Sequence, residues 1–411
     1  MHFFSRYSKY IGIPLLSLLV IGLAVLGTAR LATHAVGTSS SKPSVTCGAW
    51  STIASSNATT TTDNVLNAIA VVSAKNVWSV GYYVDPNTGF KQALTEQWNG
   101  TGWTVFPGAT LATNNVLTGL VVIPKTTRLW AVGYTTDPIS GLSQTLTERW
   151  NGTTWNVVAS ANVGTGNNYL TSITTVTQNN IWAAGYYVDS TTGFDQTLIE
   201  HWNGTAWSVV ASANPGKASN VLTSISAHAA NKIWVAGYFT NSSTGFDHTL
   251  TERYLNQTWQ VVASPNGDAG NSILTTIINV PGLDQMWAVG SDIRNSAPHT
   301  LIEHWDGRTW AILASPSPTG ATSVSLTGLA PLSLTSVWAV GYYVDGTSGL
   351  SQTLSMHWDG TAWTTVASLN PGTGNNAFYA TDRVPQVTKI WAVGSNSATG
   401  ASEQSLTESY C

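Results

Sequence analysis

Residues 167–214 read NNYLTSITTVTQNNIWAAGYYVDSTTGFDQTLIEHWNGTAWSVVASAN, and this stretch decides the fold. It divides into four short apolar runs, which lie at residues 169–176, 180–188, 196–202 and 206–212. An Asp-Ser-Thr-Thr-Gly turn separates the second and third runs, and an Asn-Gly pair before the last run is a strong hairpin signal. No run has a helical period. The stretch therefore predicts four antiparallel strands joined by turns.

The stretch belongs to a repeat that fills most of the chain. The motif Trp-x-x-Gly recurs seven times at steps of 51 to 53 residues, beginning at Trp78, Trp130, Trp182, Trp234, Trp287, Trp338 and Trp391. Four-stranded units repeated at about 50 residues are typical of β-propellers. We therefore predict an all-β, seven-bladed β-propeller of four-stranded antiparallel blades. A solenoid of the same units is the alternative, and the chain ends argue against it.

The repeat also accounts for all nineteen tryptophans of the chain. Apart from the motif, they stand on either side of the Asn-Gly turn, at Trp98, Trp103, Trp150, Trp155, Trp202, Trp207, Trp259, Trp305, Trp310, Trp358 and Trp363, with Trp50 near the N-terminus. Tyr254 takes the tryptophan position in the fourth copy. Large aromatic side chains bury much apolar surface, so we expect them to pack between neighbouring sheets and not to serve a cofactor or catalysis.

The two chain ends complement each other. The seventh copy stops at Cys411 after its third strand, and the stretch CGAWSTIASSN from Cys47 matches the fourth strand of the second copy. Cys47 and Cys411 then occupy adjacent positions of one Asn-Gly-type turn. We predict that the N-terminal strand completes the last blade and that a Cys47–Cys411 disulfide replaces the severed peptide link.

The repeats resemble those of Asp-box and kelch-type β-propellers, and the resemblance covers the chain from Cys47 onward. In EHWNGTAW, at residues 200–207, Gly204 stands three residues before Trp207 as in an Asp-box, but Glu200 and Trp202 replace its Ser and Asp. Kelch repeats have a Gly-Gly pair where this chain has a single glycine, as in AVGY. The resemblance implies a propeller scaffold, on which enzymes, lectins and protein-binding modules all occur.

The N-terminus has the composition of an export signal. Arg6 and Lys9 precede nineteen uncharged residues, 11–29, and the polar stretch that follows is typical of a linker. We divide the chain into a signal peptide or membrane anchor at 1–35, a linker at 36–46 and the propeller at 47–411. Positive charge before the apolar segment predicts that the propeller is extracellular or on the cell surface. Cleavage and anchoring through residues 11–29 both stay open.

The charge of the chain argues against a nucleic-acid partner. Charged residues make up 9% of the sequence, and the formal net charge is −4. No run of Lys or Arg occurs after residue 36. We therefore expect no electrostatic binding of nucleic acid, and we expect a monomer.

The acidic residues do not form a recognisable catalytic pattern. One position of the repeat holds a glutamate in six units, at Glu96, Glu148, Glu200, Glu252, Glu303 and Glu408, and Met356 replaces it in the remaining unit. A catalytic carboxylate is needed once, so we interpret these residues as structural hydrogen-bond acceptors. No nucleophile elbow, zinc-protease or phosphate-loop motif occurs. We predict no catalytic residue, metal site or cofactor, with an extracellular glycoside hydrolase or lyase-like enzyme as the alternative.

Strand order predicts where a partner binds. In an up-and-down blade, the loop between the second and third strands (the 2–3 loop) lies on one face of the propeller. The loop from the fourth strand to the first strand of the next blade (the 4–1 loop) lies on the same face, and the 4–1 loops are long and variable. We predict that this face binds a glycan or a protein. Our candidate residues are Asp85, Asp137, Asp189, Asp345, Asn167, Asn220, Asn271, Asn375, Tyr83, Tyr187 and Tyr343. For the aspartates a self-capped turn is the favoured alternative, and for most of the tyrosines interior packing is.

The predicted disulfide is testable by replacing Cys411 with Ser. In the chain-entropy model, a link across so long a loop stabilises the fold by about 4–5 kcal/mol. We expect Cys411→Ser to lower the melting temperature and to expose the last blade to proteolysis. Mass mapping of the unreduced wild type should give one cross-linked peptide pair, and two unmodified thiols would contradict the pairing.

Overall fold

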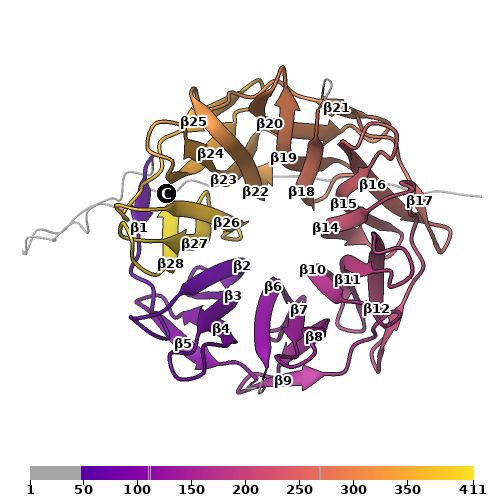
Figure 1. Ribbon diagram of the computed structural model, residues 1–411. Helices are drawn as coiled ribbons and strands as arrows, with labels where there is room; N and C mark the ends of the chain where they lie inside the picture. The colour runs from indigo at the N-terminus through magenta and orange to yellow at the C-terminus, as the bar shows by residue number, and fades with distance from the viewer. Residues whose placement is uncertain (1–47, 110, 112, 268–269) are drawn as a thin grey trace, which may run out of the picture. The chain divides into compact units, whose positions relative to one another are not determined.

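The computed structural model describes residues 48–109, 111, 113–267 and 270–411 (Figure 1). Residues Thr46–Cys411 form one compact unit. Its strands assemble into seven four-stranded sheets, and the described residues include no helix. It follows that none of the described segments is a helix able to cross a membrane. The predicted signal or anchor segment and the linker lie outside the described residues.

The sheets follow the chain order. Blades 1 to 3 contain β2 (Asn64–Ser73), β3 (Asn76–Val84), β4 (Lys91–Trp98) and β5 (Trp103–Pro107); β6 (Asn114–Val122), β7 (Leu129–Thr136), β8 (Ser143–Trp150) and β9 (Trp155–Val158); and β10 (Asn168–Thr177), β11 (Asn180–Val188), β12 (Asp195–Trp202) and β13 (Trp207–Val209). Blades 4 and 5 contain β14 (Asn220–Ala229), β15 (Lys232–Thr240), β16 (Asp247–Leu255) and β17 (Thr258–Val261); and β18 (Ser272–Asn279), β19 (Met286–Arg294), β20 (Ala297–Trp305) and β21 (Trp310–Ile312). Blade 6 contains β22 (Ala321–Ser333), β23 (Ser336–Asp345), β24 (Ser351–Trp358) and β25 (Trp363–Val366), and blade 7 contains β26 (Asn376–Arg383), β27 (Ile390–Asn396), β28 (Gln404–Tyr410) and β1 (Trp50–Thr52).

The blades close into a ring. The first strand of each blade lies nearest the axis in Figure 1 and contacts the first strand of the next blade, and β26 of blade 7 contacts β2 of blade 1. The N-terminal strand β1 pairs antiparallel with β28, with Trp50 opposite Tyr410. The predicted seven-bladed propeller and its closure by the N-terminal strand are confirmed.

The chain ends meet in the predicted turn. The carbonyl oxygen of Cys411 accepts hydrogen bonds from the backbone N–H groups of Gly48 and Ala49. The backbone N–H of Cys411 in turn donates to the carbonyl oxygen of Ala49 at 3.5 Å. Cys47 lies outside the described residues, so the disulfide stays a prediction.

Tryptophan side chains pack at the interface between each blade and the next. Trp130 of β7 lies with its ring centroid 5.0 Å from that of Trp202 and 5.4 Å from that of Trp207, both in blade 3. At the seam, Trp338 of β23 packs against Trp50 at 5.9 Å and against Tyr410 at 4.2 Å. Strand β1 therefore supplies the same aromatic wedge as an ordinary fourth strand. This confirms the packing role predicted for the tryptophans.

The glycine of the Trp-x-x-Gly motif allows the first two strands of a blade to approach closely. A Cβ atom on Gly185 would lie 2.0 Å from the carbonyl oxygen of Tyr169 in the neighbouring strand. The register of β10 against β11 shifts at this point, between Leu170 and Ser172. The other six motif glycines meet the equivalent carbonyl oxygen at 1.9 to 2.0 Å. A register shift next to the motif glycine recurs in all seven blades, as expected of a β-bulge at this position.

The buried glutamates tie neighbouring blades together. Glu200 Oε2 accepts a hydrogen bond from Ala161 N at 3.2 Å, and Glu252 Oε2 accepts one from Ala213 N at 3.1 Å. All six glutamates of this repeat position are fully buried. Five of the six carboxyl groups therefore accept a hydrogen bond from the segment that follows the fourth strand of the preceding blade; the donors to Glu96, Glu148 and Glu408 are Ser55, Ala109 and Leu369.

Two prolines explain the departures from this pattern. Pro265 and Pro316 stand where the other blades have the donating residue, and proline has no N–H to donate. Opposite Pro316 the acceptor is replaced by the fully buried Met356. Opposite Pro265 the glutamate is kept, and neither carboxyl oxygen of Glu303 has a hydrogen-bond partner among the described residues. Burial raises the pKa of Glu303 well above its usual value.

The glutamates predict a fold that loses stability as pH rises. Burial raises the pKa of Glu200 and Glu252 from 4.5 to about 7. The native state keeps these protons at pH values where the unfolded chain has lost them. The free energy of unfolding therefore falls as pH rises from about 4.5 through 7, by up to about 3 kcal/mol per site in total, of which about 1 kcal/mol is lost above about pH 6.5. Burial lowers the pKa of His201, so the measurement is best made above about pH 6.5, where this histidine is neutral.

The matched variant is Glu200→Gln, whose neutral amide can still accept the hydrogen bond from Ala161 N. We expect its melting temperature to exceed that of the wild type at about pH 8.5 and to vary less with pH. Calorimetry of both proteins between about pH 6.5 and 8.5 measures this difference. A wild type that becomes more stable towards pH 8.5 would contradict the assignment.

Candidate functional site

The two faces of the propeller are built from different loops. The 2–3 turns and the 4–1 loops lie on one face, which we call the first face. The 1–2 and 3–4 turns lie on the other, the second face. Each first strand runs from the first face to the second, so residue position along a strand tells which face a side chain is near.

The predicted aspartates cap their own 2–3 turns on the first face. Asp137 Oδ1 accepts hydrogen bonds from Ser140 N at 2.7 Å and from Ile139 N at 2.9 Å. These bonds lower the pKa of Asp137. Equivalent backbone hydrogen bonds lower the pKa of the other three, Asp85, Asp189 and Asp345. Each carboxylate is thus engaged in the turn that carries it.

The predicted asparagines are engaged with the protein. Asn167, Asn271 and Asn375 each accept a backbone N–H from the start of the third strand of the preceding blade, at 2.9 to 3.0 Å. Asn220 is fully buried, and its amide bonds Gly216 N, Gly216 O and Ala218 O within the 4–1 loop. The first three fix blade against blade, and Asn220 fixes a loop and presents no surface to a ligand.

The predicted tyrosines pack largely against the interior. Tyr83, Tyr187 and Tyr343 are half-buried and contact three separate hydrophobic clusters between blades. Tyr83 also lines a pocket of about 350 Å³ together with Gln92 and Phe106. A ligand-binding role for the three residues stays a prediction.

The structure brings together a different set of tyrosines, which the sequence alone does not single out. They follow the motif glycine in the second strand, or lie in the first strands of blades 3 and 7. We call this set the tyrosine arc; it consists of Tyr342, Tyr379, Tyr82, Tyr134, Tyr169, Tyr186 and Tyr238. All seven side chains are half-buried.

The arc follows the ring at the first-face end of the inner strands. Tyr134 of blade 2 lies 4.9 Å from Tyr169 of blade 3 between ring centroids, and Tyr169 lies 5.0 Å from Tyr186. Tyr342 lies 6.2 Å from Tyr379, which lines the central channel. The arc therefore links tyrosines of neighbouring blades across their interfaces. It is interrupted in blade 5, where Ser291 takes the tyrosine position.

Several arc tyrosines have raised pKa values, and most arc hydroxyl groups have no hydrogen-bond partner among the described residues. Burial, with Glu403 and Asp63 nearby, raises the pKa of Tyr82 to about 12. Burial also raises the pKa values of Tyr134 and Tyr186. Apart from Tyr379, whose hydroxyl bonds Ser395 Oγ at 3.2 Å, no arc hydroxyl hydrogen-bonds to the described residues. The oxygen atoms of these unpartnered hydroxyl groups are not fully buried, so each of them is in contact with solvent.

The two faces carry opposite charge. The first face carries nine carboxyl groups and three cationic groups among the described residues. The carboxyl groups belong to Asp63, Asp85, Asp137, Asp189, Asp195, Asp247, Asp292, Asp345 and Glu403, and the cationic groups belong to Lys91, Lys217 and Arg294. On the second face the described cationic groups outnumber the carboxyl groups. The cationic groups belong to Lys75, Lys125, Arg128, Arg149, Lys232, Arg253, Arg308, Arg383 and Lys389, and the carboxyl groups belong to Asp284, Asp306, Asp359 and Asp382. The small net charge of the whole sequence gives no indication that negative and positive groups are separated between the two faces.

The central channel encloses about 570 Å³ and is lined by the first strands. Thr171 Oγ1 donates to the carbonyl oxygen of Leu222 in the next blade at 2.9 Å, and Thr223 Oγ1 donates to that of Leu274 at 2.8 Å. Threonines at this position elsewhere in the ring do the same, so the lining hydroxyls are engaged. Asp382 Oδ2 accepts Val71 N at 2.8 Å across the seam, and burial raises its pKa to about 6. These contacts hold the blades together.

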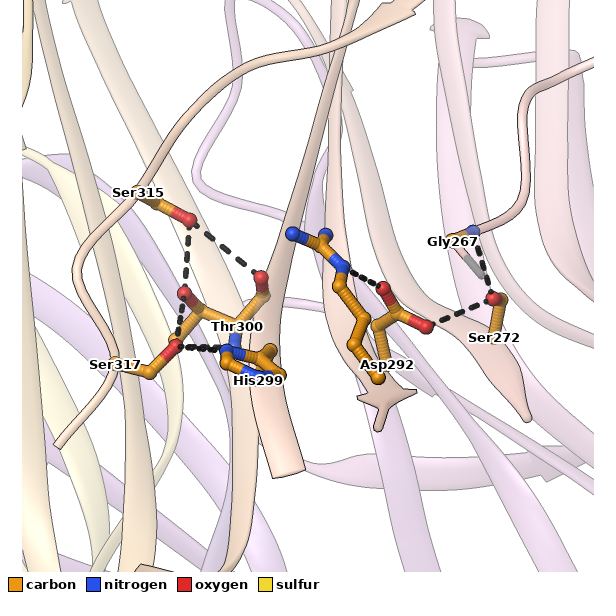
Figure 2. A network of polar contacts seen from close by, with 8 residues as sticks. Gly267, Ser272, Asp292, His299, Thr300, Ser315 and Ser317 are labelled. Carbon is orange, nitrogen blue, oxygen red and sulfur yellow. Dashed lines mark hydrogen bonds and ion pairs between the residues drawn. The ribbon is translucent and has the colours of Figure 1, made fainter. Parts of the chain in front are cut away.

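Blade 5 contains a polar network that the other blades lack (Figure 2). The fully buried carboxyl group of Asp292 accepts hydrogen bonds from Ser272 Oγ at 3.0 Å and from Arg294 Nε. Ser272 Oγ also accepts Gly267 N at 3.1 Å. In five other blades one buried asparagine at the Ser272 position fixes the loop, as Asn168 does with Val163 N at 2.8 Å, and in blade 6 Val324 takes this position. Ser272 and Asp292 together thus replace that asparagine.

No metal centre is formed by the described residues, because no group of three or more His, Cys, Asp and Glu side chains is placed to hold an ion. His299 Nδ1 lies 3.3 Å from Ser317 Oγ, in the loop that follows the fourth strand (Figure 2). This histidine therefore helps to secure that loop.

Solved structures share the fold of this chain. A structure described as YCF48 bound to a D1 peptide is 14% identical with a TM-score of 0.53, and the match covers 90% of this chain and 97% of that one. A polysaccharide lyase of family PL25, an ulvan lyase bound to -[GlcA(1-4)Rha3S]-, is 10% identical with a TM-score of 0.53, covering 84% and 94%. No protein-family model and no curated protein matches the sequence. The similarity supports the propeller fold alone, and the Asp-box or kelch type of repeat stays a prediction.

Proposed function

We propose that this protein is an exported or cell-surface binding module that recognises a protein or glycan ligand through its first face. The N-terminal sequence supports export, with anchoring through residues 11–29 if they are retained. A Cys47–Cys411 disulfide fits an oxidising compartment. Propellers often present variable loops on a rigid ring, which suits recognition.

The tyrosine arc is the observation that carries the proposal. Half-buried tyrosines with open hydroxyl groups combine apolar surface with hydrogen-bonding capacity, and such residues are enriched at binding sites. The threonine hydroxyls that line the channel, such as that of Thr171, and the carboxyl group of Glu200, by contrast, are engaged in hydrogen bonds between blades. The arc is therefore the feature of the first face best suited to contact a ligand.

An extracellular glycoside hydrolase or lyase-like enzyme is the second candidate function. One observation favours it: in blade 5 Asp292 stands opposite His299 on the neighbouring strand and is hydrogen-bonded to Arg294, a combination that no other blade repeats. The hydrogen bonds of Asp292 with Ser272 and Arg294 support a structural role for that carboxyl group. We therefore place binding ahead of catalysis.

A glycan array and a pull-down with the full chain test the proposal. The double variant Tyr134→Ser/Tyr238→Ser introduces the residue that blades 5 and 7 carry at this position. We expect it to lose the captured ligand because both substitutions remove aromatic surface from the first face. The matched control is Asp359→Asn on the second face. Asn203 stands at the equivalent turn position and accepts the same backbone hydrogen bonds.

The results separate the two candidate functions. A ligand lost by the double variant and retained by Asp359→Asn supports first-face binding. A ligand that both retain, or the absence of any captured ligand, contradicts it. Cleavage products from the same glycans, abolished by Asp292→Asn, would favour the enzyme.

A further inference from the structure

One position at the start of the third strand changes charge around the ring. It holds Lys91 in blade 1, Asp195 in blade 3, Asp247 in blade 4 and Glu403 in blade 7. In blade 1 the ammonium nitrogen of Lys91 lies 4.1 Å from the ring centroid of Tyr82. A cation this close to an aromatic ring is attracted by the ring quadrupole. Blade 1 therefore places a cation of its own on the tyrosine arc.

Blades 2 to 4 present the arc without such a cation. Tyr134, Tyr169 and Tyr186 are in ring contact, and Asp195 is close enough to Tyr186 to affect its ionisation. Asp195 and Asp247 both act on Tyr238 in the same way. Among the described residues no lysine or arginine lies over these four rings. Aromatic rings, open phenol oxygens and two carboxylates thus converge where blade 1 has its lysine.

We propose that the first face of blades 2 to 4 binds a basic segment of a partner protein, whose lysine or arginine side chains occupy the tyrosine arc beside Asp195 and Asp247. This inference rests on the proposed function and names the ligand class. A ligand cation would take the position that Lys91 holds on Tyr82. The carboxylates and phenol oxygens accept its N–H groups, and the ring faces attract its charge.

The charge of the first face favours a basic polypeptide over a glycan. Nine carboxyl groups against three cationic groups repel uronic-acid or sulfated chains and attract basic ones. Neutral sugars stack on open, flat aromatic rings. Here the Tyr134 and Tyr169 rings meet edge to face at 81°, and the arc side chains are half-buried. The result is a set of tilted, half-buried rings with oxygen atoms beside them, which suits a side-chain cation better than a sugar ring.

Fluorescence anisotropy with labelled octalysine and the full chain tests this inference. The triple variant Tyr169→Val/Tyr186→Ser/Asp195→Ser introduces residues that other blades carry at the same positions, such as Val116, Ser291 and Ser143. We expect it to weaken octalysine binding by about tenfold or more. Asp359→Asn, which alters one charge on the second face, is expected to leave binding unchanged. Thermal melting verifies folding, and Asp195→Ser alone replaces the triple variant if that protein fails to fold.

Labelled octaglutamate and a neutral cello-oligosaccharide are the competing probes. Preference for octalysine, lost in the triple variant, supports the inference. Equal octalysine affinity of wild type and variant overturns it, and so does preference of the arc for octaglutamate or for the oligosaccharide. If the first face captures a ligand in the pull-down or array but octalysine does not bind, this inference fails and the proposed function stands. If neither experiment detects first-face binding, both fail.

Discussion

The propeller depends on one contact made seven times: the tryptophan of each second strand packs against two aromatic residues at the outer edge of the next blade. A single four-stranded sheet cannot bury both of its faces, so each blade is stable only beside its neighbours. The seventh contact decides whether the units form a ring or an open array. It is made by Trp50 of β1 and Tyr410 of β28 against Trp338 of blade 6. The first and last described strands, β1 and β28, thus supply the two aromatic residues that a single blade supplies at the other interfaces.

Much of the fold could be predicted from the sequence because the aromatic residues that make this contact recur at a regular spacing along the chain. The spacing of the motif gives the number of blades, and the match between the N-terminal strand and a missing fourth strand gives the closure. The departures from the repeat also have a physical logic. Met356 stands opposite Pro316, where the backbone donor is absent, and Ser272 with Asp292 replaces a buried asparagine. Such paired changes are readable in the sequence only once the contacts are known.

The candidate site was less predictable, and the tyrosines show why. Successive residues such as Tyr186 and Tyr187 point to opposite faces of a strand. Both faces of a propeller blade pack on neighbours, so alternation does not tell which tyrosine belongs to the interior. Tyr187 is among the residues predicted from the sequence, whereas Tyr186 lies on the arc. Pairing across blades, as between Tyr134 and Tyr169, has no local signal in the chain. The separation of charge between the faces is likewise invisible until alternate turns are assigned to opposite sides.

Hydrogen–deuterium exchange of the full chain, with and without its captured ligand, tests directly whether the first face is the binding surface. We expect the added protection to fall on the 2–3 turns and 4–1 loops of the blades that carry the arc. We also expect the 3–4 turns, such as the one led by Asp359, to exchange at unchanged rates. Protection confined to those 3–4 turns, with the first face unaffected, would contradict first-face binding.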